Sequence, residues 1–280
     1  MGVSKITPTR FYLHKQKPKG AIETTMATKI LYVGDTQVNV QTSIKGIDSW
    51  TFTYYSDSAR YLRNALNAAD DIVCTHIPSM NCIADMPSTV EEFKQYDAVI
   101  VSDVGWNNIN LQPGNTQPYR LPMGPDRPKA LVEYVEQGGG FMMIGGWLSF
   151  SGMQGKGMYG GTPVETILPV TCVPRGADDR MEITQGYAMQ LDDPEHPIVK
   201  GIDWNTPYMF MGYNKVILRD DAHLVASYNG DVQIATRQVG KGRSCVFTSD
   251  VGPHWAGNFL EHPDYARFWQ QVARWVGGAK

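Results

Sequence analysis

The chain has 280 residues, 42% of them hydrophobic, and a formal net charge of −3, so it is long enough to bury a large α/β core. Basic and acidic residues are interspersed, which argues against a nucleic-acid-binding surface, and no apolar run approaches the roughly 20 residues that span a bilayer. Because the N-terminus also lacks the apolar segment of a signal peptide, we expect a cytoplasmic protein with no nucleic-acid or membrane partner.

The first residues differ from the rest of the chain. Residues 1–25 are basic and lack hydrophobic periodicity, and Met26 immediately precedes the first convincing strand. We expect an N-terminal extension over residues 1–25, without a catalytic role, and one domain over residues 26–280. The alternative is that this extension joins the subunits of a homo-oligomer.

From Met26 to Gly146, short apolar segments alternate with amphipathic ones, the pattern of a parallel sheet with crossover helices. Ser88 and Glu91 have the spacing of a helix-capping box. Strands are expected at Lys29–Gly34, Ile72–Ile77, Ala98–Val104 and Phe141–Ile144, and helices at Ser58–Ala69, Met86–Tyr96 and Arg127–Gln137.

The second half is β-rich and ends in a helix. We expect a loop at Ser151–Gly161, with Gly152–Gly161 as a mobile glycine-rich flap, and hairpin turns at Asn229-Gly230 and at 240–242. Beyond the flap, a short helix is expected at Val164–Leu168, strands at Met181–Leu191, Lys215–Leu218, His223–Tyr228, Val232–Arg237 and Arg243–Thr248, and a last helix at Pro263–Val276. The predicted fold is a flavodoxin-like three-layer α/β/α sandwich, whose mainly parallel sheet carries antiparallel C-terminal additions.

Three predicted strands deliver an aspartate just beyond their carboxyl ends, where open parallel sheets bind ligands. These residues are Asp35, Asp103 and Asp250. Together they could orient a base, hold a divalent cation or bind a polar ligand. The alternative is that each aspartate only caps a following helix or ties down its loop.

The segment Gly145-Gly146-Trp147-Leu148-Ser149 has a strand entering a glycine-bearing turn, the local pattern of a nucleophile elbow with a strained central residue. Here the sequence resembles the class I glutamine amidotransferase-like superfamily, especially its branch without an assigned function, and more distantly the ThuA-like proteins. Further resemblance lies in residues 98–107, 193–201, 212–214 and 240–255.

The sequence departs from the pattern of this superfamily at the reactive position. Amidotransferases of this class carry a Gly-x-Cys-x-Gly elbow, whose thiolate attacks glutamine with help from a histidine and an acidic residue. Here Trp147 occupies the cysteine position and Ser149 the second glycine position. An indole is no nucleophile, and none of the four cysteines follows this strand. We therefore expect no glutaminase activity.

The remaining residues still predict a pocket for a small polar or carbohydrate-like ligand. If catalysis survives, its candidates are Ser149, His254, Asp103 and Asp250, with the Ser149 hydroxyl as nucleophile and His254 as base. The alternative for His254 is a loop histidine that bonds to backbone. No cofactor is expected, and no metal, because the histidines lack metal-site spacing. The full predicted ligand-binding set is Asp35, Asp103, Trp106, Asn107, Gly146, Trp147, Ser149, Asp250, His254 and Trp255.

Three functional hypotheses remain open at this stage. The leading one is an amidotransferase-like protein that binds a small polar ligand without glutaminase activity. The second is a hydrolase or isomerase of a sugar or similar metabolite. The third is a non-catalytic oligomeric scaffold, in which Trp269 and Trp275 of the last helix pack a subunit interface.

Overall fold

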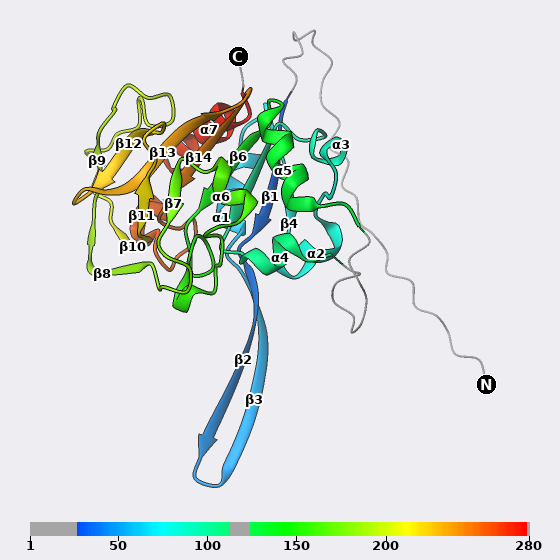
Figure 1. Ribbon diagram of the computed structural model, residues 1–280. Helices are drawn as coiled ribbons and strands as arrows, with labels where there is room; N and C mark the ends of the chain where they lie inside the picture. The colour runs from blue at the N-terminus through cyan, green and yellow to red at the C-terminus, as the bar shows by residue number, and fades with distance from the viewer. Residues whose placement is uncertain (1–26, 113–123, 279–280) are drawn as a thin grey trace, which may run out of the picture.

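The computed structural model describes residues 27–112 and 124–278, so the predicted extension over residues 1–25 lies outside the described residues. An eight-stranded sheet forms the centre (Figure 1). Five neighbouring strands are parallel, in the order β4 (Ile72–Ile77), β1 (Thr28–Gly34), β5 (Ala98–Ser102), β6 (Gly140–Ile144) and β14 (Gly242–Phe247). Numbered along the parallel strands this is 2-1-3-4-5, the flavodoxin order.

The sheet continues with antiparallel strands from the second half of the chain. These are β13 (Asp231–Val239), β12 (His223–Tyr228) and β9 (Gln190–Leu191). Asn229 and Gly230 both have positive φ, at 49° and 84°, as the predicted hairpin turn requires. The predicted flavodoxin-like fold with antiparallel C-terminal additions is therefore confirmed.

Helices cover both faces of the sheet, which gives the three layers. One face packs against α1 (Arg60–Asn67) and α7 (Tyr265–Val276), because Leu62, Phe268 and Trp269 point into its core. The other face is covered by α2 (Cys82–Asp85), α3 (Val90–Phe93), α4 (Trp106–Asn110), α5 (Arg127–Glu136) and α6 (Pro163–Ile167). Short 3-10 turns are η1 (Ser79–Asn81), η3 (Met153–Gly155) and η4 (Gly257–Glu261).

Two small antiparallel sheets flank the main one. They pair β10 (Phe210–Asn214) with β8 (Arg180–Tyr187), and β11 (Val216–Leu218) with β7 (Val170–Cys172). Neither β7 nor β10 was among the predicted strands.

Several local predictions were wrong. The capping box belongs to Thr89 and Glu92, because their side chains and backbone N–H groups bond reciprocally, so Ser88 precedes the box. The loop predicted as a mobile flap is packed instead: Ser151 and Tyr159 are buried, and the Tyr159 amide donates to the Phe150 carbonyl at 3.0 Å. Trp269 lies in the monomer core, which removes its support for the scaffold hypothesis.

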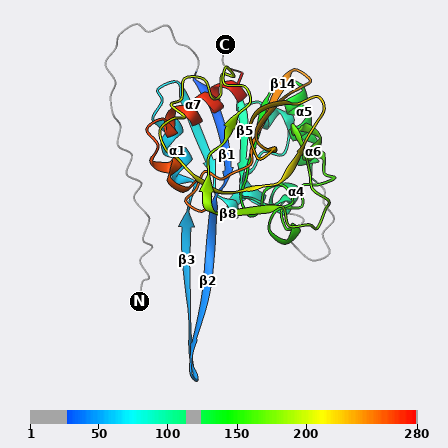
Figure 2. The ribbon, with the colours of Figure 1, turned by 90° about the vertical axis from the view of Figure 1, so that its left-hand side faces the viewer.

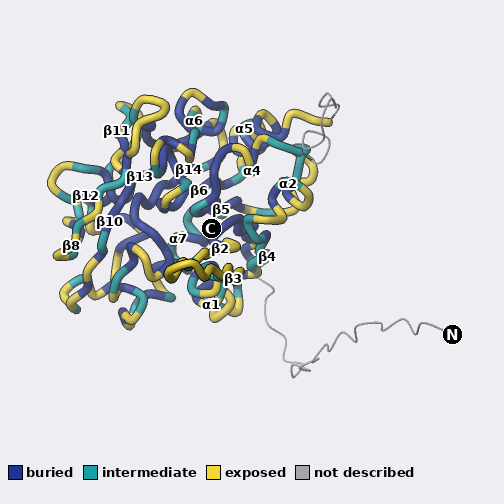
Figure 3. Tube along the Cα trace, turned by 90° about the horizontal axis from the view of Figure 1, so that it is seen from below, coloured by how far each residue is buried: buried dark blue, intermediate teal, exposed yellow. Residues whose placement is uncertain are grey.

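A long two-stranded ribbon was missed altogether. Strands β2 (Thr36–Lys45) and β3 (Asp48–Asp57) form an antiparallel hairpin between β1 and α1. It projects far from the body of the molecule (Figures 1 and 2) and is exposed along almost all of its length (Figure 3). We call this hairpin, residues 36–57, the arm.

Candidate functional site

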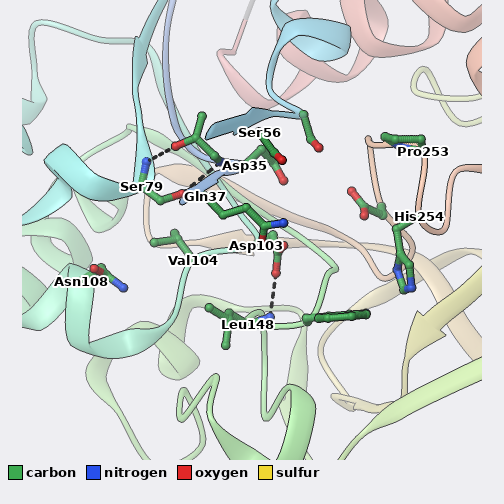
Figure 4. A pocket seen from close by; sticks show the side chains of 14 residues that line it. Asp35, Gln37, Ser56, Ser79, Asp103, Val104, Asn108, Leu148, Pro253 and His254 are labelled. Carbon is green, nitrogen blue, oxygen red and sulfur yellow. Dashed lines mark hydrogen bonds between the residues drawn. The ribbon is translucent and has the colours of Figure 1, made fainter. Parts of the chain in front are cut away.

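A pocket of about 460 Å³ lies beyond the carboxyl ends of the parallel strands, beside the base of the arm (Figure 4). Asp35, Asp103 and Asp250 all line it, so the three predicted strand-end aspartates do converge. The lining consists of Asp35, Thr36, Gln37, Ser56, Ser58, Ser79, Asp103, Val104, Asn108, Trp147, Leu148, Asp250, Pro253 and His254.

Asp35 follows β1 directly and is buried. Its backbone is left-handed, with φ at 55°, a conformation that aspartate tolerates at a cost on the order of 1 kcal/mol or more. The buried Tyr32 hydroxyl donates a hydrogen bond to its carboxylate. Burial, and then the nearby Asp250 and Asp103, raise the pKa of Asp35 well above its usual value.

Asp103 follows β5, also in a left-handed conformation with φ at 43°. Its carboxylate accepts the Leu148 amide at 2.7 Å (Figure 4). Its own amide donates to the Ser149 hydroxyl at 3.1 Å. Burial raises the pKa of Asp103, and hydrogen bonds from the Leu148 and Trp147 amides partly offset that rise. Asp103 thus both lines the pocket and ties down the neighbouring turn, so the two predicted roles coexist.

Asp250 arrives from the end of β14 and is buried. Its carboxylate accepts the Gly252 amide at 2.8 Å. Burial, and then the charge of Asp103, raise the pKa of Asp250 to about 7. This raised pKa keeps the carboxyl group protonated at higher pH than an ordinary aspartate, which suits it to take part in proton transfer.

The turn after β6 is built around Gly146. This residue has φ at 146°, and a Cβ atom there would lie 2.7 Å from Cβ of Asp103. Left-handed backbone occurs at Gly146 and at Phe150, and not at Trp147. The predicted strain at the position of the missing cysteine was therefore wrong, because glycine takes the strained conformation one residue earlier.

A buried polar network holds this turn in place. Asn214 accepts the Gly146 amide at 2.9 Å and donates to the Asp179 carboxylate at 2.7 Å. That carboxylate also accepts the amides of Ser151 and Gly152. In the sequence, Asn214 stands out only as part of a resembling segment and Asp179 does not stand out, because their contacts join segments far apart in the chain.

Trp147 and His254 form the side wall of the pocket. The indole is 39% exposed, and its ring centroid lies 4.9 Å from that of His254 in an edge-to-face arrangement. Burial lowers the pKa of His254, and the nearby Glu182 partly offsets that effect. The imidazole is therefore mainly neutral at neutral pH, as a proton acceptor must be.

Several predicted site residues do not line the pocket. Ser149 is buried, and its hydroxyl donates to the Ile144 carbonyl at 2.5 Å, so both its hydrogen-bonding roles serve the backbone. Trp106 packs edge-on against Tyr159 in the core. Asn107 is exposed, and its neighbour Asn108 lines the pocket instead.

The two remaining members of the predicted set are buried and do not line the pocket. The buried Trp255 donates its indole N–H to Glu182 at 3.0 Å. Gly146 is buried under Asp103 and is needed for close approach, not as a lining group. The structure therefore brings together Asp35, Asp103, Trp147, Asp250 and His254 from the ten predicted residues.

The cysteines lie elsewhere. None of Cys74, Cys82, Cys172 and Cys245 lines the pocket, and burial raises the pKa of each thiol, to about 12 for Cys74 and Cys82. A high pKa keeps these thiols protonated and unreactive.

The lining of the pocket is acidic. Among the described residues that line it there are three aspartates and no lysine or arginine. In the part of the chain that the structure describes, no three His, Cys, Asp or Glu side chains are grouped closely enough to hold a metal ion. Over the same residues, no helix has the length and apolar character needed to cross a membrane.

This fold, with a glycine turn after β6 and acidic and imidazole groups around it, defines a class I glutamine amidotransferase-like protein. The sequence profile of the family described as "Putative glutamine amidotransferase" matches residues 29–278, and the chain belongs to that family. No curated protein matches the sequence.

Solved structures agree with this assignment. A cytoplasmic protein from Salmonella typhimurium is 31% identical, with a TM-score of 0.82 over 88% of this chain and 98% of that one. A second, from Salmonella typhimurium LT2, is 33% identical, with a TM-score of 0.80 over 89% and 99%. A ThuA-like protein from Parabacteroides merdae shares the fold alone, at 12% identity and a TM-score of 0.52 over 91% of each chain.

Proposed function

We propose that this protein binds a small, hydroxyl-rich or amine-bearing molecule in the strand-end pocket and does not hydrolyse glutamine. The observation that carries the proposal is the convergence of Asp35, Asp103 and Asp250 in one cavity that no cysteine reaches. By analogy with the two Salmonella proteins, we further propose that it acts in the cytoplasm, as one domain over residues 26–280.

The chemistry of the lining supports a ligand that donates hydrogen bonds. Ionised carboxylates only accept, whereas a protonated one also donates, so three aspartates with raised pKa values can match a polyol in several protonation states. Trp147 adds an apolar wall, as small-molecule sites commonly have.

The same lining disfavours glutamine. Its α-carboxylate pairs best with a cationic side chain, and the described lining residues include no lysine or arginine. The thiolate chemistry of the family would also require a nucleophile at residue 147, where the indole of Trp147 has none.

A thermal-shift screen tests the proposal. The panel comprises neutral sugars, polyols, primary amines and glutamine, applied to the wild type, to Asp250→Asn and to the control Asp221→Asn, whose side chain lies outside the pocket. We expect polyols or amines to raise the Tm of the wild type and of the control, and to raise that of Asp250→Asn much less. Stabilisation by glutamine together with ammonia release, or no response to any compound, would contradict the proposal.

A second candidate function is a hydrolase or isomerase of the same ligand class. It is favoured by one observation: a carboxyl group with a pKa of about 7, Asp250, and the mainly neutral His254 line the same pocket. Such a pair can supply an acid and a base. Incubating each stabilising compound with the wild type and with Asp250→Asn, and following product by NMR, separates the enzyme from the binding protein.

A further inference from the structure

The arm has the composition of an interface and not of a solvated loop. Residues 36–57 include only three charged side chains, Lys45, Asp48 and Asp57. An isolated two-stranded hairpin has only marginal stability in water, because no further strand or helix covers its side chains. The arm nevertheless carries many large apolar groups, which need a partner.

Both faces of the arm are exposed and apolar. The register pairs Val38 with Tyr55 on one face, where Val40 and Ile44 also lie. The other face carries Trp50, Phe52 and Tyr54, because side chains alternate along β3.

Within residues 27–112 and 124–278, the body of the molecule covers neither face. Thr36 at the base is buried and exchanges hydrogen bonds with Ser79, at 2.8 and 3.2 Å. Farther out, the side-chain bonds from Asn39 to Ser56 and between Thr42 and Thr51 stay within the arm. The views in Figures 1 and 2, taken at right angles, both show the arm standing clear of every other described element.

We propose that the arm binds a second copy of this chain, with two copies exchanging arms about a two-fold axis. A nearly uncharged ribbon offers no electrostatic match to nucleic acid or to an anionic membrane. In a second copy, the exposed Met80 of η1 lies beside the base of its own arm and offers an apolar contact there. Self-complementary contacts of this kind are what a two-fold dimer requires.

The dimensions of the arm suit a dimer. Ten residues at roughly 3.3 Å each give a ribbon about 33 Å long, and two strands make it roughly 10 Å wide, so one face covers about 330 Å². Two exchanged arms and their two receiving surfaces together bury about four times that area, roughly 1,300 Å². This lies within the range of stable, specific interfaces, about 1,200–2,000 Å².

The arm also connects the proposed interface to the pocket. Thr36, Gln37 and Ser56 belong to the arm and line the pocket. A second copy held along the arm therefore lies near the pocket mouth. The dimer does not depend on what the pocket binds, so its test stands apart from that of the proposed function.

The test is the molar mass in solution, measured by light scattering after size exclusion over a dilution series. We expect the wild type to have twice the 31.2 kDa of one chain. The double substitution Val40→Ser and Phe52→Ser alters one residue on each face and is expected to weaken the dimer at least tenfold. The matched control is Ile217→Ser, an equally exposed apolar residue on β11, which should leave the mass unchanged.

A second variant distinguishes loss of the dimer from misfolding of the chain. Replacing residues 39–54 by a two-residue Asn-Gly turn removes most of the arm and leaves the body intact, and it should give a folded monomer by circular dichroism. A wild type of 31.2 kDa at every concentration, or arm variants that keep the wild-type mass, would overturn the proposal. Sedimentation of a monomeric wild type with phosphatidylcholine vesicles would also overturn it, in favour of a membrane-binding arm.

Discussion

The indole of Trp147 stands edge-to-face against the imidazole of His254, with ring centroids 4.9 Å apart and planes at 85°. In the amidotransferases that the sequence resembles, a thiol at this turn faces a histidine. In this chain the turn presents an inert indole to the imidazole, so this pair cannot supply a thiolate nucleophile.

The first prediction restores a thiol at the turn. In Trp147→Cys, the new thiol should be alkylated by iodoacetamide, because residue 147 is exposed and lies beside a base. The native cysteines should react only after unfolding, since burial raises their pKa values. Intact-mass spectrometry should show one adduct on the folded variant and none on the folded wild type. Equal labelling of both proteins would refute the placement of residue 147.

The second prediction concerns Asp250 and pH. Because the folded-state pKa of about 7 lies above the usual value, folding favours the protonated form. This stabilisation is complete below about pH 4 and is lost as the pH rises through 7. Asp250→Asn is uncharged throughout, so its Tm should exceed that of the wild type by several degrees near pH 8.5 and match it near pH 4.5.

Its control is Asp221→Asn, because the ion pair with Arg237 lowers the pKa of Asp221 instead of raising it. That variant should show no gain in Tm at alkaline pH. A Tm of Asp250→Asn that follows the wild type at every pH would mean that Asp250 is ionised in the folded protein under all these conditions.

The third prediction separates structure from catalysis at Ser149. Removing the hydroxyl in Ser149→Ala leaves the half-buried Asp103 amide without its acceptor, which costs about 1–3 kcal/mol. Denaturant unfolding should show this loss, while any compound that binds the wild type should bind the variant equally well. The exposed Ser49→Ala is the control and should not change stability. Loss of turnover without loss of stability would instead identify Ser149 as a nucleophile.

The fourth prediction concerns Gly146. An alanine there must adopt φ near 146° and place its Cβ 2.7 Å from that of Asp103, so we expect Gly146→Ala to lose more than about 2 kcal/mol. Gly161→Ala is the control, since φ is 72° but no atom lies within 4 Å of the new Cβ, and it should lose only about 1 kcal/mol. Both are measured by chemical unfolding, and equal losses would refute the packing argument.

Much of the fold follows from local sequence patterns. The strand Ile72–Ile77 was predicted with its observed bounds, because apolar strands between turn residues have a distinctive signature. The arm was missed, although Val38 and Val40 alternate with polar residues and Gly46 marks a turn. An alternating pattern does not tell whether a strand joins the main sheet or leaves the molecule.

The sequence by itself determined the flavodoxin-like fold, the missing nucleophile at Trp147 and the meeting of Asp35, Asp103 and Asp250, because parallel strands must end at one common edge. Only the tertiary structure decided which neighbouring side chains enter the pocket. Leu148 and Asn108 line it, while Ser149 and Asn107 do not. The direction of a side chain in a tight turn depends on backbone dihedral angles and on distant contacts such as that of Asn214 with Gly146, and neither is written in the local sequence.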